Sequence, residues 1–255
     1  MKFVLLLLLA AVGAASAQTA TPLPNLKPED GPANYGLCLD TARAYPEQGL
    51  DFAVNWQTLG GGEPAKHCAA VAKIGLRRYA EAAKDLTALG IASKRGNDIR
   101  AGLLAQAGQA WFLGGELQQA NETQDAALKL VVESSPQKAA LLIDRAMTLA
   151  AREKYQDAIV DLSGALVIDP TNATSLAFRA NAYRALQQLD RALSDAERAV
   201  KADPKNVEAL LERGNVYRLL ERVNEARADW AKVVELAPDS EAGHVARAEI
   251  ERLAR

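Results

Sequence analysis

Residues 173–206 read ATSLAFRANAYRALQQLDRALSDAERAVKADPKN, and residues 207–240 read VEALLERGNVYRLLERVNEARADWAKVVELAPDS. Residues 139–172, AALLIDRAMTLAAREKYQDAIVDLSGALVIDPTN, align with both without a gap. Proline recurs at the interval set by these units, at Pro136, Pro170, Pro204 and Pro238. A fixed period between about 20 and 50 residues indicates a stack of repeated structural units.

Two apolar stripes of helical period run through each unit. Positions 4, 8 and 11 form the first stripe, and positions 20, 24 and 27 form the second. Position 8 is always small and position 20 is always alanine. The residues are Ala146, Ala180 and Gly214 at position 8, and Ala158, Ala192 and Ala226 at position 20. Small residues let two helices touch, and proline at position 32 cannot continue the second helix. Each unit therefore predicts a pair of antiparallel helices.

This pattern resembles the tetratricopeptide repeat, a helix–turn–helix unit of about 34 residues. The resemblance implies an all-α, right-handed α-solenoid of antiparallel helix pairs, with about five to six pairs and a C-terminal capping helix. We expect three regular repeats over 139–240 and two divergent repeats over 63–138, the second with a second helix four residues longer than usual before Pro136. Residues 34–62 are expected to form an irregular helical pair, and residues 241–255 a polar helix that caps the stack. Asn172 is expected to cap the helix that follows it.

The composition favours helices and argues against several classes of function. Alanine accounts for 51 of the 255 residues, and aromatic residues for only 5%. The net charge of −2 offers neither a nucleic-acid footprint nor a polybasic membrane anchor. Two histidines and two cysteines do not make a zinc site of the usual four-ligand kind. We therefore expect no metal, no cofactor and no nucleic-acid partner.

The N-terminus resembles a secretory signal peptide. Lys2 precedes an apolar run over 3–12, and Ala15-Ser16-Ala17 matches an A-x-A cleavage site. Residues 1–17 are therefore predicted to be removed, and residues 18–33, which contain four prolines, to form a flexible lead-in tail. We expect an exported protein without membrane insertion after cleavage, periplasmic in a Gram-negative bacterium and secreted otherwise.

Cys38 and Cys68 are the only thiols. In an oxidising compartment an even pair favours a disulfide, and the closed loop would stabilise the fold by roughly 3–4 kcal/mol in the chain-entropy model. The alternative is that both are small buried apolar residues.

A recurring pair of opposite charges lies within each regular unit. Arginine occupies position 7 and aspartate position 23, in the pairs Arg145 and Asp161, Arg179 and Asp195, and Arg213 and Asp229. The constant offset between the two positions favours a contact between the two helices of one repeat. The alternative is a charged stripe that binds a ligand.

Four side chains are candidates for binding. In the family that the pattern resembles, positions 2, 5, 9 and 12 face a concave groove. Position 9 is Asn181 and Asn215, and position 12 is Arg184 and Arg218. The amides suit a peptide backbone and the guanidinium groups suit carboxylates; in the 139–172 unit the stripe turns apolar, with Met147 and Ala150. The alternative is that the four are ordinary solvated residues.

No catalytic constellation accompanies the repeats, so we do not expect an enzyme. The resemblance favours an exported adaptor that binds a peptide or protein segment in the concave groove. The alternative is a structural or assembly subunit of an envelope complex that uses its convex face or its ends. The oligomeric state is left open.

Overall fold

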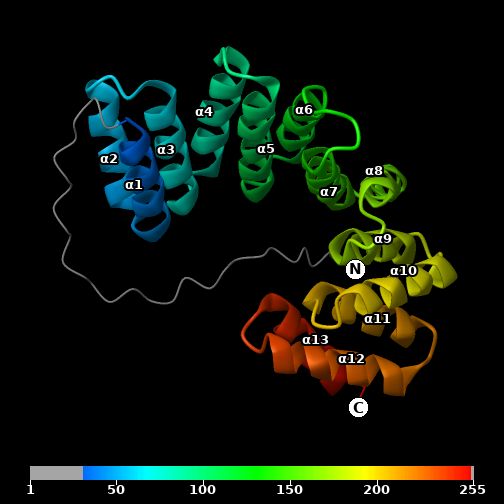
Figure 1. Ribbon diagram of the computed structural model, residues 1–255. Coiled ribbons are helices and arrows are strands. Elements are labelled where there is room, and N and C mark those ends of the chain that lie inside the picture. The colour runs from blue at the N-terminus through cyan, green and yellow to red at the C-terminus, as the bar shows by residue number, and fades with distance from the viewer. Residues whose placement is uncertain (1–30, 254–255) are drawn as a thin grey trace. The chain divides into compact units, whose positions relative to one another are not determined.

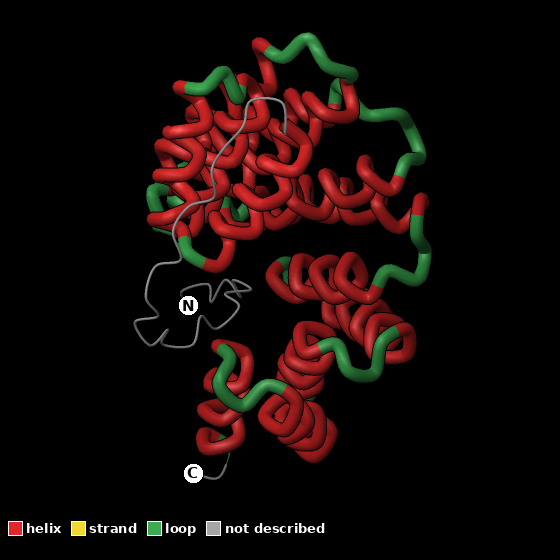
Figure 2. Tube along the Cα trace, turned by 60° about the vertical axis from the view of Figure 1, so that its left-hand side comes forward, coloured by secondary structure: helices red, strands yellow, loops and turns green. Residues whose placement is uncertain are grey.

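The computed structural model describes residues 31–253. The predicted signal peptide, residues 1–17, lies outside the described residues, and so does the predicted tail up to residue 30. The chain divides between Glu133 and Ser134 into two compact units, which are described separately below. All regular secondary structure of the described residues is helical, and Figure 2 shows the helices joined by short loops.

The first unit consists of three helix pairs. They are α1 (Gly31–Ala44) with α2 (Pro46–Thr58), α3 (Gly62–Gly75) with α4 (Tyr79–Ala92), and α5 (Asn97–Leu113) with α6 (Leu117–Leu128). Each helix packs against the next along the chain, as Figure 1 shows. α1 also packs against α3, so the irregular pair predicted over 34–62 joins the same stack.

The second unit holds three further pairs and a last helix. They are α7 (Pro136–Ala151) with α8 (Tyr155–Ile168), α9 (Ala173–Ala185) with α10 (Leu189–Ala202), α11 (Val207–Leu219) with α12 (Val223–Leu236), and finally α13 (Glu241–Arg252). The first helices of neighbouring pairs also pack together, α7 on α9 and α9 on α11. The predicted all-α stack of helix pairs with a terminal helix is thus confirmed for the described residues.

Helix ends follow the local sequence signals. α8, α10 and α12 each end two residues before one of the recurring prolines. The next helix then begins after a side chain that accepts a hydrogen bond from its first turn. The capping oxygens belong to Asn172, Asn206 and Ser240, at 2.9, 2.9 and 3.0 Å from the backbone nitrogens of Ser175, Ala209 and Gly243. The predicted cap at Asn172 is confirmed, and each cap satisfies a backbone donor that the helix leaves free.

The junction before Pro136 differs from our expectation. The second helix of that repeat, α6, is not extended and ends at Leu128. The additional residues lie instead in the turns of 129–135. Pro136 then becomes the first residue of α7, capped by Ser135, because proline at this position loses no helical hydrogen bond.

The predicted close approach of the two helices in a repeat is present. Ala146, Ala180 and Gly214 are buried, and so are the alanines at position 20. Gly214 shows why small residues are needed there, since a Cβ atom on it would lie 2.6 Å from Nε1 of Trp230. Trp230 fills the space opposite and has no exposed surface.

The turn inside each pair of the second unit contains one residue with a positive φ. These residues are Glu153, Gln187 and Glu221, with φ angles of 61°, 60° and 60°. In the first unit the corresponding turn between α5 and α6 uses Gly115, with a φ of 79°. No helix in the described part of the chain is long and apolar enough to span a bilayer.

Candidate functional site

The four predicted binding residues line one groove in the second unit. Residues of α7, α8, α9, α11 and α13 line a space of about 590 Å³, which we call the α9–α11 groove. Asn181 and Arg184 reach it from α9, and Asn215 and Arg218 from α11. Positions 9 and 12 lie about one turn apart on the same helix face, so each helix presents its amide and its guanidinium group on the same side.

Two of the four already hold an internal carboxylate. Nδ2 of Asn181 donates to Oε2 of Glu212 at 3.0 Å, and Nε of Arg184 donates to Oε1 of Glu212 at 2.5 Å. Glu212 is only 6% exposed. Burial lowers the pKa of Arg184, but the charge and the hydrogen bonds of Glu212 outweigh burial and raise that pKa overall. Asn181 and Arg184 thus join α9 to α11 across the floor of the groove.

Asn215 and Arg218 are less engaged by internal hydrogen bonds than Asn181 and Arg184. Asn215 is partly exposed, and its side-chain amide makes no hydrogen bond with the residues that the structure describes. Nε of Arg218 lies 3.6 Å from Oε2 of Glu249 and is buried without a hydrogen-bond partner among those residues. Asn215 therefore offers both a donor and an acceptor to an occupant.

Further polar residues of the groove were not predicted from the sequence. Arg252 and Glu249 of α13 line it, and Arg252 forms an ion pair with Glu249. Arg184, Arg218 and Arg252 follow one another at the repeat interval, so continuing the register into 241–255 would have identified Arg252. Glu212 stands at position 6, which is not expected to face the groove, and no sequence signal marks it.

The wall opposite is apolar. Met147 and Ala150 of α7 line the groove, as their register positions predicted. Phe178 of α9 joins them and packs, partly buried, on the cluster that includes Leu149 and Leu162. The groove therefore has an apolar part, formed by Met147, Ala150 and Phe178, and a polar part to which α9, α11 and α13 contribute.

The recurring Arg–Asp pairs lie within the repeats, as the constant offset predicted. Each arginine donates two hydrogen bonds to its aspartate, from Nε and from Nη2, at distances between 2.6 and 2.9 Å. The aspartates are 4–6% exposed, and the hydrogen bonds to Asp195 and Asp229 raise the pKa values of Arg179 and Arg213. Because the aspartates are buried and each pair is bidentate, the geometry of the pairs constrains the two helices of each repeat strongly.

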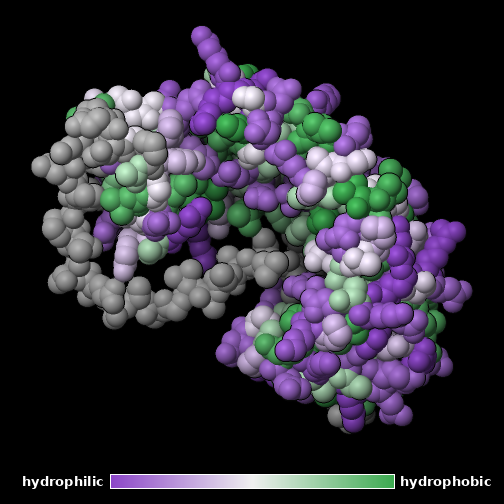
Figure 3. All heavy atoms as spheres, in the orientation of Figure 1, coloured by the Kyte–Doolittle hydropathy of each residue, from purple (hydrophilic) through white to green (hydrophobic). Residues whose placement is uncertain are grey.

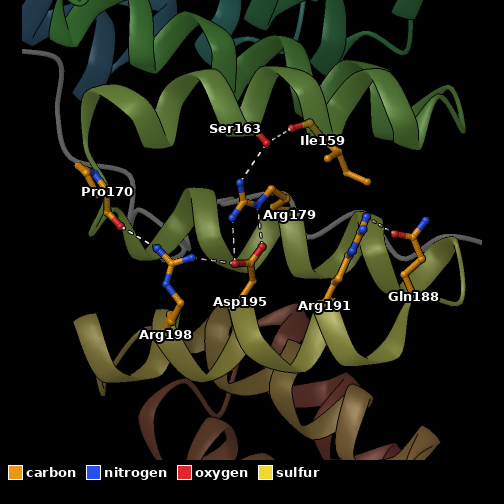
Figure 4. Close-up of polar contacts among 8 residues, drawn as sticks. All are labelled: Ile159, Ser163, Pro170, Arg179, Gln188, Arg191, Asp195 and Arg198. Carbon is orange, nitrogen blue, oxygen red and sulfur yellow. Dashed lines mark hydrogen bonds and ion pairs between the residues drawn. The ribbon is translucent and has the colours of Figure 1, made fainter.

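One of these pairs also joins neighbouring repeats. Nη1 of Arg179 donates to Oγ of Ser163 on α8, at 3.0 Å (Figure 4). Arg198 donates to Asp195 and to the backbone oxygen of Pro170. Arg179 therefore fixes α8, α9 and α10 relative to one another, which in turn positions the α9 side of the groove.

The first unit holds the two cysteines and a histidine. Cys38 and Cys68 are fully buried, with their Cα atoms 6.1 Å apart and their sulfurs within bonding distance. His67 accepts a hydrogen bond at Nδ1 from the hydroxyl of Tyr35 (2.7 Å) and donates from Nε2 to Oε1 of Gln106 (2.9 Å). Both nitrogens of its ring are thus occupied, and the described residues contain no cluster of three or more metal-binding side chains.

Comparisons with known proteins agree with this helical-repeat architecture. Residues 179–241 match the family model described as tetratricopeptide repeat. The MamA structure (residues 41 to the end) from Desulfovibrio magneticus RS-1 is similar, with a TM-score of 0.57, 21% identity, and coverage of 70% of this chain and 97% of that one. The Cut9–Hcn1 hetero-tetramer of the APC/C contains a chain with a TM-score of 0.65 and 16% identity, which covers 88% of this chain and 43% of that one. No curated protein matches the sequence.

These matches and the helix pairs define the class of fold. The described residues form stacked helix pairs, and residues 179–241, in the region of the α9–α11 groove, are similar to tetratricopeptide repeats.

Proposed function

We propose that the protein is an exported interaction adaptor that binds a peptide or protein segment in the α9–α11 groove. The observation that carries the proposal is the groove itself, in which side chains from successive repeats gather and Asn215 keeps its amide unpaired. A volume of about 590 Å³ is in the range of ligand-binding clefts. The similarity of residues 179–241 to tetratricopeptide repeats supports a binding role and identifies no reaction.

The contacts of Glu212 change the roles within the predicted set. We assign the direct contact to Asn215, which has both hydrogen-bonding functions free. Asn181 and Arg184 support the floor by holding Glu212, so replacing them tests the fold together with binding. Arg218 combines the two roles, direct contact and internal support, since it faces Glu249 and also lines the groove.

A second surface provides the rival proposal of an assembly subunit. On the outer side of α8, Val160 and Val167 are 63% and 80% exposed. They lie two turns apart on the same face of the helix, and apolar patches interrupt the hydrophilic surface in this region of Figure 3. An assembly partner would cover this face and leave the groove open.

One titration distinguishes the two surfaces. The partner recovered by affinity capture from the native compartment is titrated against Asn215→Ala and against Val160→Thr combined with Val167→Thr. Groove binding predicts a loss of about tenfold in affinity for Asn215→Ala alone, because one hydrogen bond at a partly buried interface is lost. Loss with the valine variant and unchanged binding by Asn215→Ala would instead support the assembly subunit. Circular dichroism checks that both variants remain folded.

Export is a separate part of the proposal and has its own test. The apolar run and the Ala15-Ser16-Ala17 site support cleavage after Ala17. N-terminal sequencing of the exported protein should therefore begin at Gln18, and an intact Met1 in that compartment would contradict the signal peptide.

A further inference from the structure

We infer that the occupant of the α9–α11 groove is a short segment without net charge, anchored by one bulky apolar side chain that packs on Met147, Ala150 and Phe178. The inference rests on the proposed function, since it names the chemistry of the segment that the groove binds. It departs from the sequence prediction, which gave Arg184 and Arg218 acidic partners.

The charges of the groove are balanced internally. The lining includes three arginines and three glutamates, namely Arg184, Arg218, Arg252, Glu208, Glu212 and Glu249. Arg184 is paired with Glu212, while Arg218 and Arg252 both face Glu249. An acidic occupant at Arg184 would have to displace the buried carboxylate of Glu212 and leave it unpaired, which is costly. A charged segment therefore has no electrostatic advantage over a neutral one.

On the apolar side of the groove, side chains remain partly exposed to solvent. Met147, Ala150 and Phe178 are only partly buried, and the last two pack on a buried cluster of leucines and alanines. A bulky apolar side chain placed on them would complete this cluster and remove apolar surface from water. The polar contact available nearby is the amide of Asn215, two helices further along the stack.

The spacing of the helices sets the length of the segment. Packed helices lie about 8–10 Å apart, and an extended chain advances about 3.3 Å per residue. The step from the α7–α9 wall to Asn215 on α11 therefore spans roughly three to six residues. We expect the apolar anchor at that distance from the backbone amide that Asn215 binds.

The test uses short random peptides displayed on phage and selected on the full protein. An enriched peptide is then synthesised, together with a version in which its apolar residue is alanine. Its affinity is measured by calorimetry below and above physiological ionic strength. The proteins compared are wild type, Met147→Gln, Asn215→Ala and the control Ile91→Gln, at an exposed apolar residue of α4 in the first unit.

We expect the enriched peptides to share one bulky apolar residue and no net charge. Replacing that residue by alanine should weaken binding about tenfold or more, and Met147→Gln should weaken the parent peptide about tenfold while hardly affecting the alanine peptide. Affinity should change less than about twofold with salt, because no net charge is neutralised. Ala150→Gln, which fills the apolar wall, should act like Met147→Gln if the latter perturbs the helix.

Two other outcomes would be decisive in different ways. Acidic peptides whose binding falls steeply with salt and requires Asn215 would overturn this inference and leave the groove as the binding site. Enriched peptides that bind equally to Met147→Gln, Asn215→Ala and wild type, or the absence of any enriched peptide, would overturn the proposed function as well.

Discussion

Gly214 and Trp230 show how a large side chain at one position restricts the residue at a neighbouring position to glycine. At position 8 the other regular repeats have alanine, and at position 24 they have Leu162 and Ala196 in place of tryptophan. The indole of Trp230 occupies the volume that a Cβ atom on residue 214 would need. The small residue at position 8 was predictable from the pattern, whereas the requirement for glycine depends on its particular neighbour.

We predict that Gly214→Ala destabilises the second unit by about 1–3 kcal/mol, because the rigid indole cannot move away without disturbing the core. The measurement is urea unfolding monitored by circular dichroism. Combining it with Trp230→Leu recreates the Ala146 and Leu162 pair of the first regular repeat, so the double variant should be more stable than the sum of the single effects. Strict additivity would show that the contact with Trp230 does not cause the destabilisation.

His67 is expected to make the first unit sensitive to acid. Burial lowers the pKa of its imidazole, the hydrogen bond to Gln106 partly opposes this, and the positive charge of Arg43 lowers the pKa further. Because the folded pKa lies below the value of an unfolded histidine, about 6.5, the unfolded chain binds the proton first as pH falls. Stability is therefore complete above about pH 6.5 and decreases below it, toward the folded pKa.

The measurement compares wild type with His67→Gln in urea unfolding at about pH 7 and pH 5, on either side of the pKa of an unfolded histidine. The wild-type free energy of unfolding should fall more between these pH values than that of the variant, since carboxylates contribute equally to both. An identical pH dependence would exclude His67 as the responsible group.

At the scale of the helix and its turn, two glycines of the first unit have opposite roles. Gly115 lies in the turn after α5 with a φ of 79°, and Gly102 lies within α5. A Cβ atom at either position meets no other atom within 4 Å, so only the backbone distinguishes them. We predict that Gly115→Ala destabilises by about 1 kcal/mol, while Gly102→Ala stabilises by up to about 1 kcal/mol. Thermal unfolding of the two variants should show shifts of opposite sign, and shifts of the same sign would refute the assignment.

The elements that the sequence predicted best are those with repeated copies. Three aligned units revealed which positions face inward, so the helices of 139–240, the Arg–Asp pairs and the residues of the groove were predictable. The end of α6 could not be predicted in this way. A short insertion can lie in a helix or in a turn, and residues 129–135 have no counterpart in the aligned repeats.

The sequence also did not predict which groove residues have internal hydrogen-bond partners. Register places Asn181 and Arg184 at the groove, but whether they are free depends on Glu212, a residue from the next repeat that no spacing rule connects with them. A contact between repeats requires the helix geometry, whereas a contact within a repeat recurs visibly at a constant offset.

At the scale of the whole molecule, the cysteines distinguish the two units. Both lie in the first unit, where Cys38 and Cys68 pack with Phe52 and Trp56. We predict a disulfide, so titration of denatured, unreduced protein should find no free thiol. Reduction should lower the stability of α1–α3 by roughly 3 kcal/mol, as expected for a loop of this length. Hydrogen exchange should accelerate in α1–α3 and remain unchanged in α9–α12, and equal acceleration in both units would contradict this local role.

The ion pairs also determine how freely repeats can be exchanged. Arg145 with Asp161 and Arg213 with Asp229 are contained in single repeats, so each would survive if its repeat were moved or copied. Glu212 is different, because its partners Asn181 and Arg184 come from the preceding repeat.

If residues 173–206 were deleted, Met147 and Ala150 would take the register positions of those partners, and the Glu212 carboxylate would face an apolar wall. An unpaired buried charge is far more costly than a broken surface contact. The order of the repeats in this chain is consequently fixed by one buried glutamate, although the repeats themselves look interchangeable in sequence.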